Sequence, residues 1–421
     1  MKPSVLIATT SRWFPTARLA AALASAGCSV DAVCPTGHPM TNLSGMRKIC
    51  SYKGLTPLRS FSEAIRATRP DLIVPGDDVA TRHLHRLYER EHERRHEDDR
   101  ELRSGQAGNS ICALIERSLG SSESFPVVYA RTAFIDVARE AGVRAPKTEV
   151  IANRSALKRW ATNVGFPTVL KANGTSGGDG VRVVDTLEEA EQAFRRLQAP
   201  PLLLRALKRA VVDRDKTLLR PSVFRQRPEV NAQEFVPGRE ATSAVACWNG
   251  AVLASLHFEV VNKRDAAGPS TVLRLIEHAE MSAAVETMVR RLNLSGLHGF
   301  DFMLEAHTGD AYLIEINPRA TQVGHLTLGA GRDLPAALYA ALSGAELRTA
   351  PKITENDTIA LFPQEWTRDP ESPFLQSAYH DVPWNEPELL RVFSSKLKQQ
   401  GALTLQTKPV QKLAPVRLPR L

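Results

Sequence analysis

The chain has 421 residues, of which 43% are hydrophobic and 24% are charged, and its formal net charge is +8. This size and composition predict a globular protein of about two or three domains. The apolar stretch before Arg12 is too short for a secretion signal and no run approaches the length of a membrane span, so we expect a cytoplasmic protein with no membrane partner.

A parallel α/β domain is predicted for residues 1–120. The run "SVLIATT" (4–10) predicts a strand, "TARLAAALASAG" (16–27) a helix and "SVDAVCP" (29–35) a second strand. The stretch "SFSEAIRATRPDLIVPGDD" (60–78) again places a helix before a strand. Because no G-x-G-x-x-G follows the first strand, the dinucleotide-binding fingerprint is absent from the sequence of this domain.

Two segments of this domain follow strands, at the sheet edge where α/β proteins tend to bind ligands. They are "TSRWFP" (10–15) and "PGDD" (75–78). Asp77 and Asp78 would attract an ammonium group at this edge, and a helix-capping turn accounts for them equally well.

A densely charged stretch, residues 86–103, predicts an exposed helix. His92, Glu93 and His96 within it match the zinc motif H-E-x-x-H. A zinc site on a helix needs an apolar face that buries the metal, and nearly every neighbour here is charged, so we interpret the match as chance.

The cysteines of the chain predict reduced thiols. Their number is odd, they are widely spaced, and they never form C-x-x-C, which excludes a disulfide framework and a zinc ribbon. They are Cys28, Cys34, Cys50, Cys112 and Cys247.

The stretch "VLKANGTSGGDGVRVV" (169–184) places Lys171 at the end of one predicted strand and a glycine-rich loop before the next. Such a loop can lie close over phosphates and present its N–H groups, while the lysine adds a positive charge. A tight glycine hairpin without a ligand is the alternative. The loop is not a Walker A motif, because no G-K-[ST] closes it.

Helices are predicted around this stretch, at 130–142, 155–165 and 186–197, the last with a capping box of Thr186 and Glu189.

A β-hairpin is predicted from "FDFMLEA" (300–306) and "AYLIEIN" (311–317). The intervening "HTG" fits a three-residue loop with Gly309 in the left-handed conformation. We expect Ala306 to lie opposite Asp310.

This register brings acidic side chains together. Asp301 then lies across from Glu315, and the period of two puts Glu315, Asn317 and Arg319 on one face. Facing carboxylates repel each other, so a compensating cation is expected. Carboxylate and amide oxygens are hard ligands that suit Mg²⁺. The alternative is a surface hairpin with exposed acids.

Taken in chain order, these stretches resemble the ATP-grasp superfamily. The resemblance rests on Lys171 with its loop, "QEFVPGRE" (233–240), "GFDFML" (299–304) and "EINPR" (315–319), and it covers about residues 125–345. It implies a chain of α/β and α+β class. The expected parts are a parallel α/β pre-ATP-grasp domain (1–120), a two-lobed ATP-grasp domain with antiparallel sheets (121–345, lid-bearing subdomain about 150–238) and a C-terminal extension with a basic tail (346–421).

The resemblance also implies a role for each candidate site residue. Lys171 and Arg319 would be catalytic, with Lys171 on the phosphates and Arg319 steadying an acyl phosphate. Asp301, Glu315 and Asn317 would bind the metal. The nucleotide would be held by Arg131, where the family usually has lysine, by Lys171, by the loop glycines Gly177, Gly178 and Gly180, by the adenine hinge Glu234, Phe235 and Val236, and by Glu240 on the ribose. The implied cofactors are ATP and two Mg²⁺ ions, for which Mn²⁺ can substitute.

The function implied is that of a ligase. It would activate a carboxylate as an acyl phosphate, release ADP, and couple the acyl group to an amine. The expected partners are these two small molecules, and a homodimer is one option for the assembly. The alternatives are a biotin-carboxylase-like or carbamoyl-phosphate-like activity and a nucleotide-binding regulator without catalysis. The joint presence of Lys171, Asp301, Glu315, Asn317 and Arg319 argues against the regulator.

Other features are open to two interpretations. His298 and His325 would orient substrate or accept a proton, or they are core histidines. Lys263, Arg264 and Arg274 would meet a carboxylate or phosphate, or they are surface charges. Residues 391–421 contain seven Lys or Arg and no Asp or Glu. Without interleaved aromatic residues, this segment predicts a disordered or surface-docked tail in preference to a nucleic-acid-binding arm.

Overall fold

The computed structural model describes residues 2–101, 111–173, 180–199, 227–266, 268–348 and 350–391, with the side chains of residues 95–101 excepted. Residues Met1–Val382 form one compact unit and Pro383–Leu421 a second. Within the described residues, none of the helices is both long and apolar enough to cross a bilayer.

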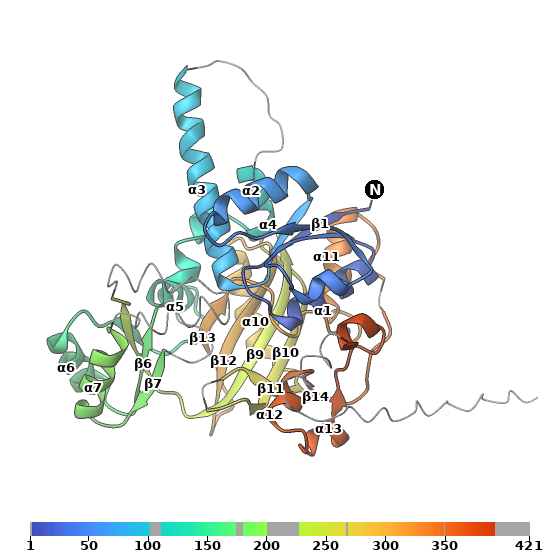
Figure 1. Cartoon of the computed structure of the whole chain (residues 1–421). Coiled ribbons are helices and arrows are strands. Elements are labelled where there is room, and N and C mark those ends of the chain that lie inside the picture. Colours follow the sequence, from blue (N-terminus) through green and yellow to red (C-terminus); the bar gives the residue numbers. More distant parts are fainter. Residues whose placement is uncertain are drawn as a thin grey trace, which may run out of the picture. The chain divides into compact units, whose positions relative to one another are not determined.

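The first part of the chain forms a four-stranded sheet with the order β3-β2-β1-β4, in which all neighbours are parallel (Figure 1, blue). This confirms the parallel α/β prediction. Buried apolar side chains of strands and helices form one core, including Leu6, Phe61, Ile73, Leu84 and Ile115. The elements are β1 (Ser4–Ala8), α1 (Phe14–Ser25), β2 (Ser29–Cys34), β3 (Met46–Ser51), α2 (Pro57–Thr68), β4 (Leu72–Pro75), α3 (Asp78–Glu101) and α4 (Ile111–Leu119).

A second four-stranded sheet is antiparallel throughout, with the order β5-β8-β6-β7. Trp160, Leu170 and Phe194 are buried in the core between this sheet and its helices. The predicted cap at Thr186 is confirmed, because its hydroxyl accepts from the Glu189 N–H at 3.2 Å. The return bond of the capping box is shifted by one residue, since the Glu189 carboxylate accepts from the Asp185 N–H at 2.9 Å. The elements are β5 (Thr148–Val150), α6 (Arg154–Asn163), β6 (Thr168–Ala172), β7 (Val181–Val184), α7 (Leu187–Leu197) and β8 (Val230–Glu234).

The third sheet has seven strands in the order β13-β12-β9-β10-β11-β14-β15. All its neighbours are antiparallel except β14 and β15. Apolar residues of α5 and α10 share a buried core with β9, β12 and β13. The elements are α5 (Arg131–Glu140), β9 (Gly238–Trp248), β10 (Ala251–Lys263), β11 (Ser270–Leu275), α10 (Ala279–Arg291), β12 (Gly296–Glu305), β13 (Ala311–Asn317), α11 (Leu334–Ser343), β14 (Thr358–Ala360), α12 (Gln364–Arg368), α13 (Phe374–Ser377) and β15 (Tyr379–His380).

These sheets confirm the predicted mixture of α/β and α+β structure. The division of the chain at residues 120 and 345 stays a prediction, although β14 and β15 from the expected C-terminal extension pair with the seven-stranded sheet. The predicted basic tail lies almost wholly outside the described residues.

A buried ion-pair cluster ties three distant segments of Met1–Val382 together. The Asp381 carboxylate, 1% exposed, accepts from Arg18 on α1 at 2.7 Å and from His325 at 2.7 Å. Burial opposes ionisation of this carboxyl group, but the charges of His325 and Arg18 outweigh it and lower the pKa of Asp381. The segment that follows β15 is therefore fixed to the N-terminal α/β domain by charge.

Replacing Asp381 with alanine is expected to lower the free energy of unfolding by about 3–5 kcal/mol, because the Arg18 charge would lose its buried partner. Urea denaturation of the wild type and the variant measures this difference. Glu63→Ala is the matched control, since Glu63 pairs with Arg59 on the exposed face of α2. Its loss should leave stability nearly unchanged. Equal unfolding transitions for the two variants would contradict the expectation.

Candidate active site

The predicted β12–β13 hairpin is present, and Asp301 lies opposite Glu315 as predicted. The expectation for the turn was wrong by one residue, because the Glu305 N–H pairs with the Asp310 carbonyl at 2.9 Å. A bulge at Ile314 shifts the ladder by one residue and restores the predicted pairing at the two acids. Gly309 has a φ of 76°, the left-handed conformation that the turn requires.

The Asp301 carboxylate is held in place by two neighbours. Its Oδ1 accepts from the Thr242 hydroxyl at 2.8 Å and its Oδ2 from the Asn317 amide at 2.8 Å. Burial, and then the charge of Glu315, raises the pKa of Asp301 well above its usual range. A carboxylate whose ionisation is opposed by burial and by a neighbouring acid forms a site that a cation would stabilise.

Arg131 links the acid pair to the strand that carries Lys171. Its Nε donates to Glu315 Oε2 at 3.2 Å, and its Nη1 donates to the Ala172 carbonyl at 2.7 Å. Arg131 is the first residue of α5, so the start of this helix contacts both the four-stranded and the seven-stranded sheet. Two segments about 130–145 residues apart in the sequence therefore meet at one guanidinium group.

Lys171 is buried, with 7% of its surface exposed. Burial lowers the pKa of its ammonium group to about 8, while the charge of Glu315 raises it and that of Arg131 lowers it. Asp301 and Glu240 also raise it by their charges. The lysine is thus within electrostatic reach of both facing acids.

The predicted hinge joins two sheets. Glu234 ends β8, and Phe235 and Val236 lead into β9. The Glu234 carboxylate accepts from the Lys147 N–H at 3.2 Å, and Val236 is buried. The main-chain groups of residues 234–236 therefore lie at the junction between the four-stranded sheet that contains β8 and the seven-stranded sheet that contains β9.

Glu240 is paired with Lys263, whose Nζ lies 2.6 Å from Glu240 Oε1. The side chain of Glu240 is 48% exposed. Lys263 is therefore already engaged by an acid, and Arg264 pairs with Asp265 at 2.9 Å. The expectation that these cations meet a substrate stays untested.

Of the predicted lid glycines, Gly177 and Gly178 lie outside the described residues, as does Gly174. Gly180 is described, and its carbonyl accepts from the N–H of Ala172, the residue after Lys171, at 2.9 Å.

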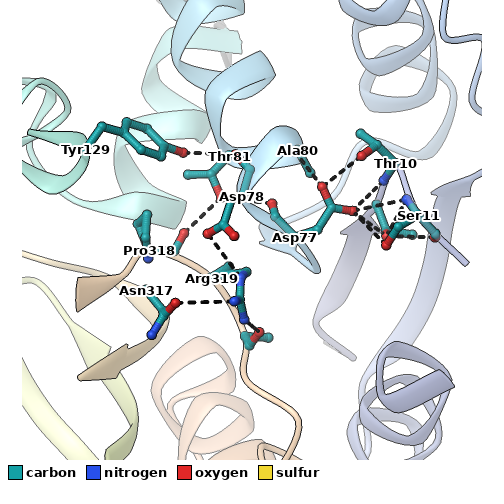
Figure 2. A network of polar contacts seen from close by, with 12 residues as sticks. Thr10, Ser11, Asp77, Asp78, Ala80, Thr81, Tyr129, Asn317, Pro318 and Arg319 are labelled. Carbon is teal, nitrogen blue, oxygen red and sulfur yellow. Dashed lines mark hydrogen bonds and ion pairs between the residues drawn. The ribbon is translucent and has the colours of Figure 1, made fainter. Parts of the chain in front are cut away.

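Arg319 contacts the start of α3 (Figure 2). Its Nε donates to Asp78 Oδ1 at 3.1 Å and its Nη2 to Asn317 Oδ1 at 3.2 Å. The guanidinium group also lies 5.7 Å from the centre of the Trp13 ring. Asp78 therefore faces an arginine of the chain itself, whereas Asp77 caps α3 by accepting from the Ala80 N–H at 2.8 Å.

The two flanking histidines have structural partners. His298 is buried and bonds to the Ser295 carbonyl at 2.8 Å, and burial lowers its pKa to about 4. His325 bonds to Asp381. The sequence did not point to Thr242, which orients Asp301, because a threonine on a strand carries no local signal of such a contact. Trp13 lies in the segment "TSRWFP" that the sequence did single out, but its contact with Arg319 was not expected.

Residues 130–331 match the family model of the carbamoyl-phosphate synthase L chain, ATP binding domain. The carbamoyl phosphate synthase large chain of Thermoplasma acidophilum is 26% identical over 229 residues, which are 52% of this chain and 20% of that protein. The large chain of Kineococcus radiotolerans is 24% identical over 257 residues, 58% of this chain and 21% of that protein. This chain thus aligns with about a fifth of the length of these relatives.

Solved structures share the fold at low sequence identity. The biotin carboxylase domain of 2-oxoglutarate carboxylase from Hydrogenobacter thermophilus, crystallised with MgADP, ADP and bicarbonate, matches with a TM-score of 0.55 and 16% identity over 83% of this chain and 71% of that chain. L-amino acid ligase from Bacillus licheniformis matches with a TM-score of 0.53 and 13% identity over 83% and 78% of the two chains.

Proposed function

The chain belongs to the ATP-grasp superfamily, and on this premise we propose that it is an ATP-dependent, ADP-forming ligase that joins a carboxylate to an amine. The observation that carries the proposal is the contact of Arg131 with both Glu315 and the Ala172 carbonyl, beside Lys171. It brings the basic and the acidic candidate residues around one place, as binding of a metal-complexed triphosphate requires.

In the first step a carboxylate oxygen attacks the γ-phosphorus of ATP. The bond from that phosphorus to the bridging oxygen breaks, and ADP leaves with an acyl phosphate formed. Lys171 and Arg131 offset the charge of the phosphates, and Arg319 offsets charge on the transferring phosphoryl group. In the second step the amine attacks the acyl carbon, phosphate leaves, and the amine loses a proton to solvent or a base.

The acid pair fits a magnesium ion. Asp301 and Glu315 supply carboxylate oxygens, and the Asn317 oxygen that accepts from Arg319 has a second lone pair. Burial and then the charge of Glu315 raise the pKa of Asp301, so a positive charge beside it would stabilise its carboxylate. When bound, the metal neutralises phosphate charge and orients the phosphates. Among the described residues no group of three His, Cys, Asp or Glu forms a metal site, so the amide is needed to complete the set.

Bicarbonate is a second candidate for the acid. It is present in the Hydrogenobacter thermophilus structure, and here it would be activated by the same residues.

The test is a screen of carboxylates, bicarbonate included, with and without amines, for release of ADP and phosphate in the presence of ATP and Mg²⁺. We expect ADP release that depends on the acid and an amide product that depends on the amine. Release of AMP and pyrophosphate would contradict the acyl-phosphate route. Absence of any acid-dependent release across the screen would favour a nucleotide-binding regulator.

The affinity for MgADP is expected to fall as the pH rises above about 8, because Lys171 then loses its positive charge. Bound phosphates favour the ammonium form and raise its pKa, so the affinity should fall by up to about tenfold per pH unit. Calorimetric titration of MgADP between about pH 7 and 9.5 measures this dependence. The Lys171→Met variant should bind MgADP more weakly than the wild type, and its affinity should depend much less on pH. An equally steep dependence in both proteins would contradict the assignment.

A further inference from the structure

The segment that carries Arg319 is held at three consecutive residues by the turn between β4 and α3. The Thr81 hydroxyl donates to the Pro318 carbonyl at 2.9 Å, Arg319 Nε donates to Asp78 at 3.1 Å, and the Ala320 N–H donates to the Pro75 carbonyl at 3.1 Å (Figure 2 draws the first two). The main chain is thus held on each side of Arg319, by a side-chain hydroxyl at Pro318 and by a main-chain carbonyl at Ala320.

The guanidinium group is fixed as well. Besides Asp78, it donates through Nη2 to Asn317 at 3.2 Å and through Nη1 to the Ala320 carbonyl at 3.2 Å. The Trp13 ring lies 5.7 Å from it, within the range of a cation–π contact. Of the five N–H groups of an arginine, three therefore bond to described residues, and two are left for oxygens of a ligand.

Asp78 is itself anchored. Its carbonyl accepts from the Tyr129 hydroxyl at 3.2 Å. The preceding residue, Asp77, accepts from the Thr9 hydroxyl at 2.7 Å and from the N–H and hydroxyl of Thr10 at 2.6 and 2.9 Å. The turn is thereby tied to the end of β1, which fixes the main chain of Asp78.

From these contacts we infer that Asp78 and Trp13 are positioning residues for Arg319, so that the N-terminal α/β domain sets the orientation of the catalytic arginine. The pair is not an ordinary surface ion pair, since the side chains of Arg319 and Asp78 are only 18% and 25% exposed. The Asp78 carboxylate accepts from Nε of Arg319. The Nη atoms of the guanidinium group are thereby directed toward Asn317 and the acid pair. The catalytic part of this inference depends on the proposed function; the positional part does not.

The kinetic test is a double-mutant cycle of Asp78→Asn with Arg319→Lys. We expect Asp78→Asn to lower kcat about 10- to 100-fold with KM for ATP nearly unchanged, as a misaligned catalytic group does. When Arg319→Lys is already present, adding Asp78→Asn should lower kcat by less than about a further twofold. Trp13→Leu should act in the same direction. Asp71→Asn is the control, since Asp71 accepts from the Ser4 N–H at the opposite end of β4. Unchanged kcat in Asp78→Asn, or costs that multiply in the double variant, would overturn the inference.

The positional test needs no substrate. The Nε–H nuclear magnetic resonance of Arg319, assigned by its loss in Arg319→Lys, should shift in Asp78→Asn and stay in place in Asp71→Asn. Thermal melting confirms that each variant is folded. A resonance that is unmoved in Asp78→Asn overturns the inference even if the substrate screen succeeds, and a shift supports it even if the screen fails.

Discussion

Replacing Glu315 with glutamine is expected to lower kcat by about 10³-fold or more while the fold stays intact. The amide has the shape of the carboxylate but lacks the charge that faces Asp301 across the ladder. Without Mg²⁺ the variant should melt close to the wild-type temperature, because the loss of repulsion between the two acids is opposed by the loss of the ion pair of Glu315 with Arg131. The stabilisation that Mg²⁺ gives the wild type should be lost. ADP release and melting curves with and without Mg²⁺ measure both effects.

Asp310→Asn is the matched control on the same hairpin. Asp310 pairs with Arg144 near the turn, at 3.3 Å, and is remote in register from the acid pair. This variant should keep wild-type turnover. Full activity in Glu315→Gln, or equal losses in the two variants, would remove Glu315 from the site.

Replacing Arg319 with alanine is expected to lower kcat by about 10²- to 10³-fold and to leave the affinity for MgADP nearly unchanged. The reason is its location: Arg319 bonds to Asn317 and Asp78, whereas Arg131 bonds to the Ala172 carbonyl beside Lys171. Its charge should therefore act on the transferring group and contribute little to holding ADP. Turnover assays and calorimetric titration with MgADP separate the two effects.

Arg144→Ala is the control for loss of an arginine that touches this hairpin. Arg144 pairs with Glu280 at 2.8 Å and with Asp310, near the turn. We expect it to keep its kcat. If Arg319→Ala loses MgADP affinity but keeps its maximal rate, the arginine binds nucleotide and is not the group that acts on the acyl phosphate.

The hairpin was predictable because it is local, but its turn register was wrong by one residue and the bulge offset this error at the acids. Two strand patterns and a glycine loop bring Asp301 near Glu315, and the buried face of the sheet leaves little freedom in register. The bulge at Ile314 was not predictable, since no glycine marks it and the choice depends on packing. Strand β3 was missed for a similar reason: most of "MRKICS" is exposed at the edge of its sheet, and no alternation of apolar residues signals it.

The contacts of Arg319 could be anticipated only in part. The segments "TSRWFP" and "PGDD" were recognised as strand ends that face a ligand-binding edge, and both do reach the candidate site. Their partner is Arg319, about 240 residues from Asp78 in the sequence. A single sequence carries no information on which distant loop approaches which strand end, so Asp78 looked like an acid available to an ammonium group.

The most direct test of the central claim is a crystal structure of the protein with ADP and Mn²⁺. We expect anomalous density for Mn²⁺ between the carboxylates of Asp301 and Glu315, and ADP phosphates within hydrogen-bonding distance of Lys171 Nζ. Mn²⁺ bound away from these acids, or ADP bound out of reach of Lys171, would contradict it.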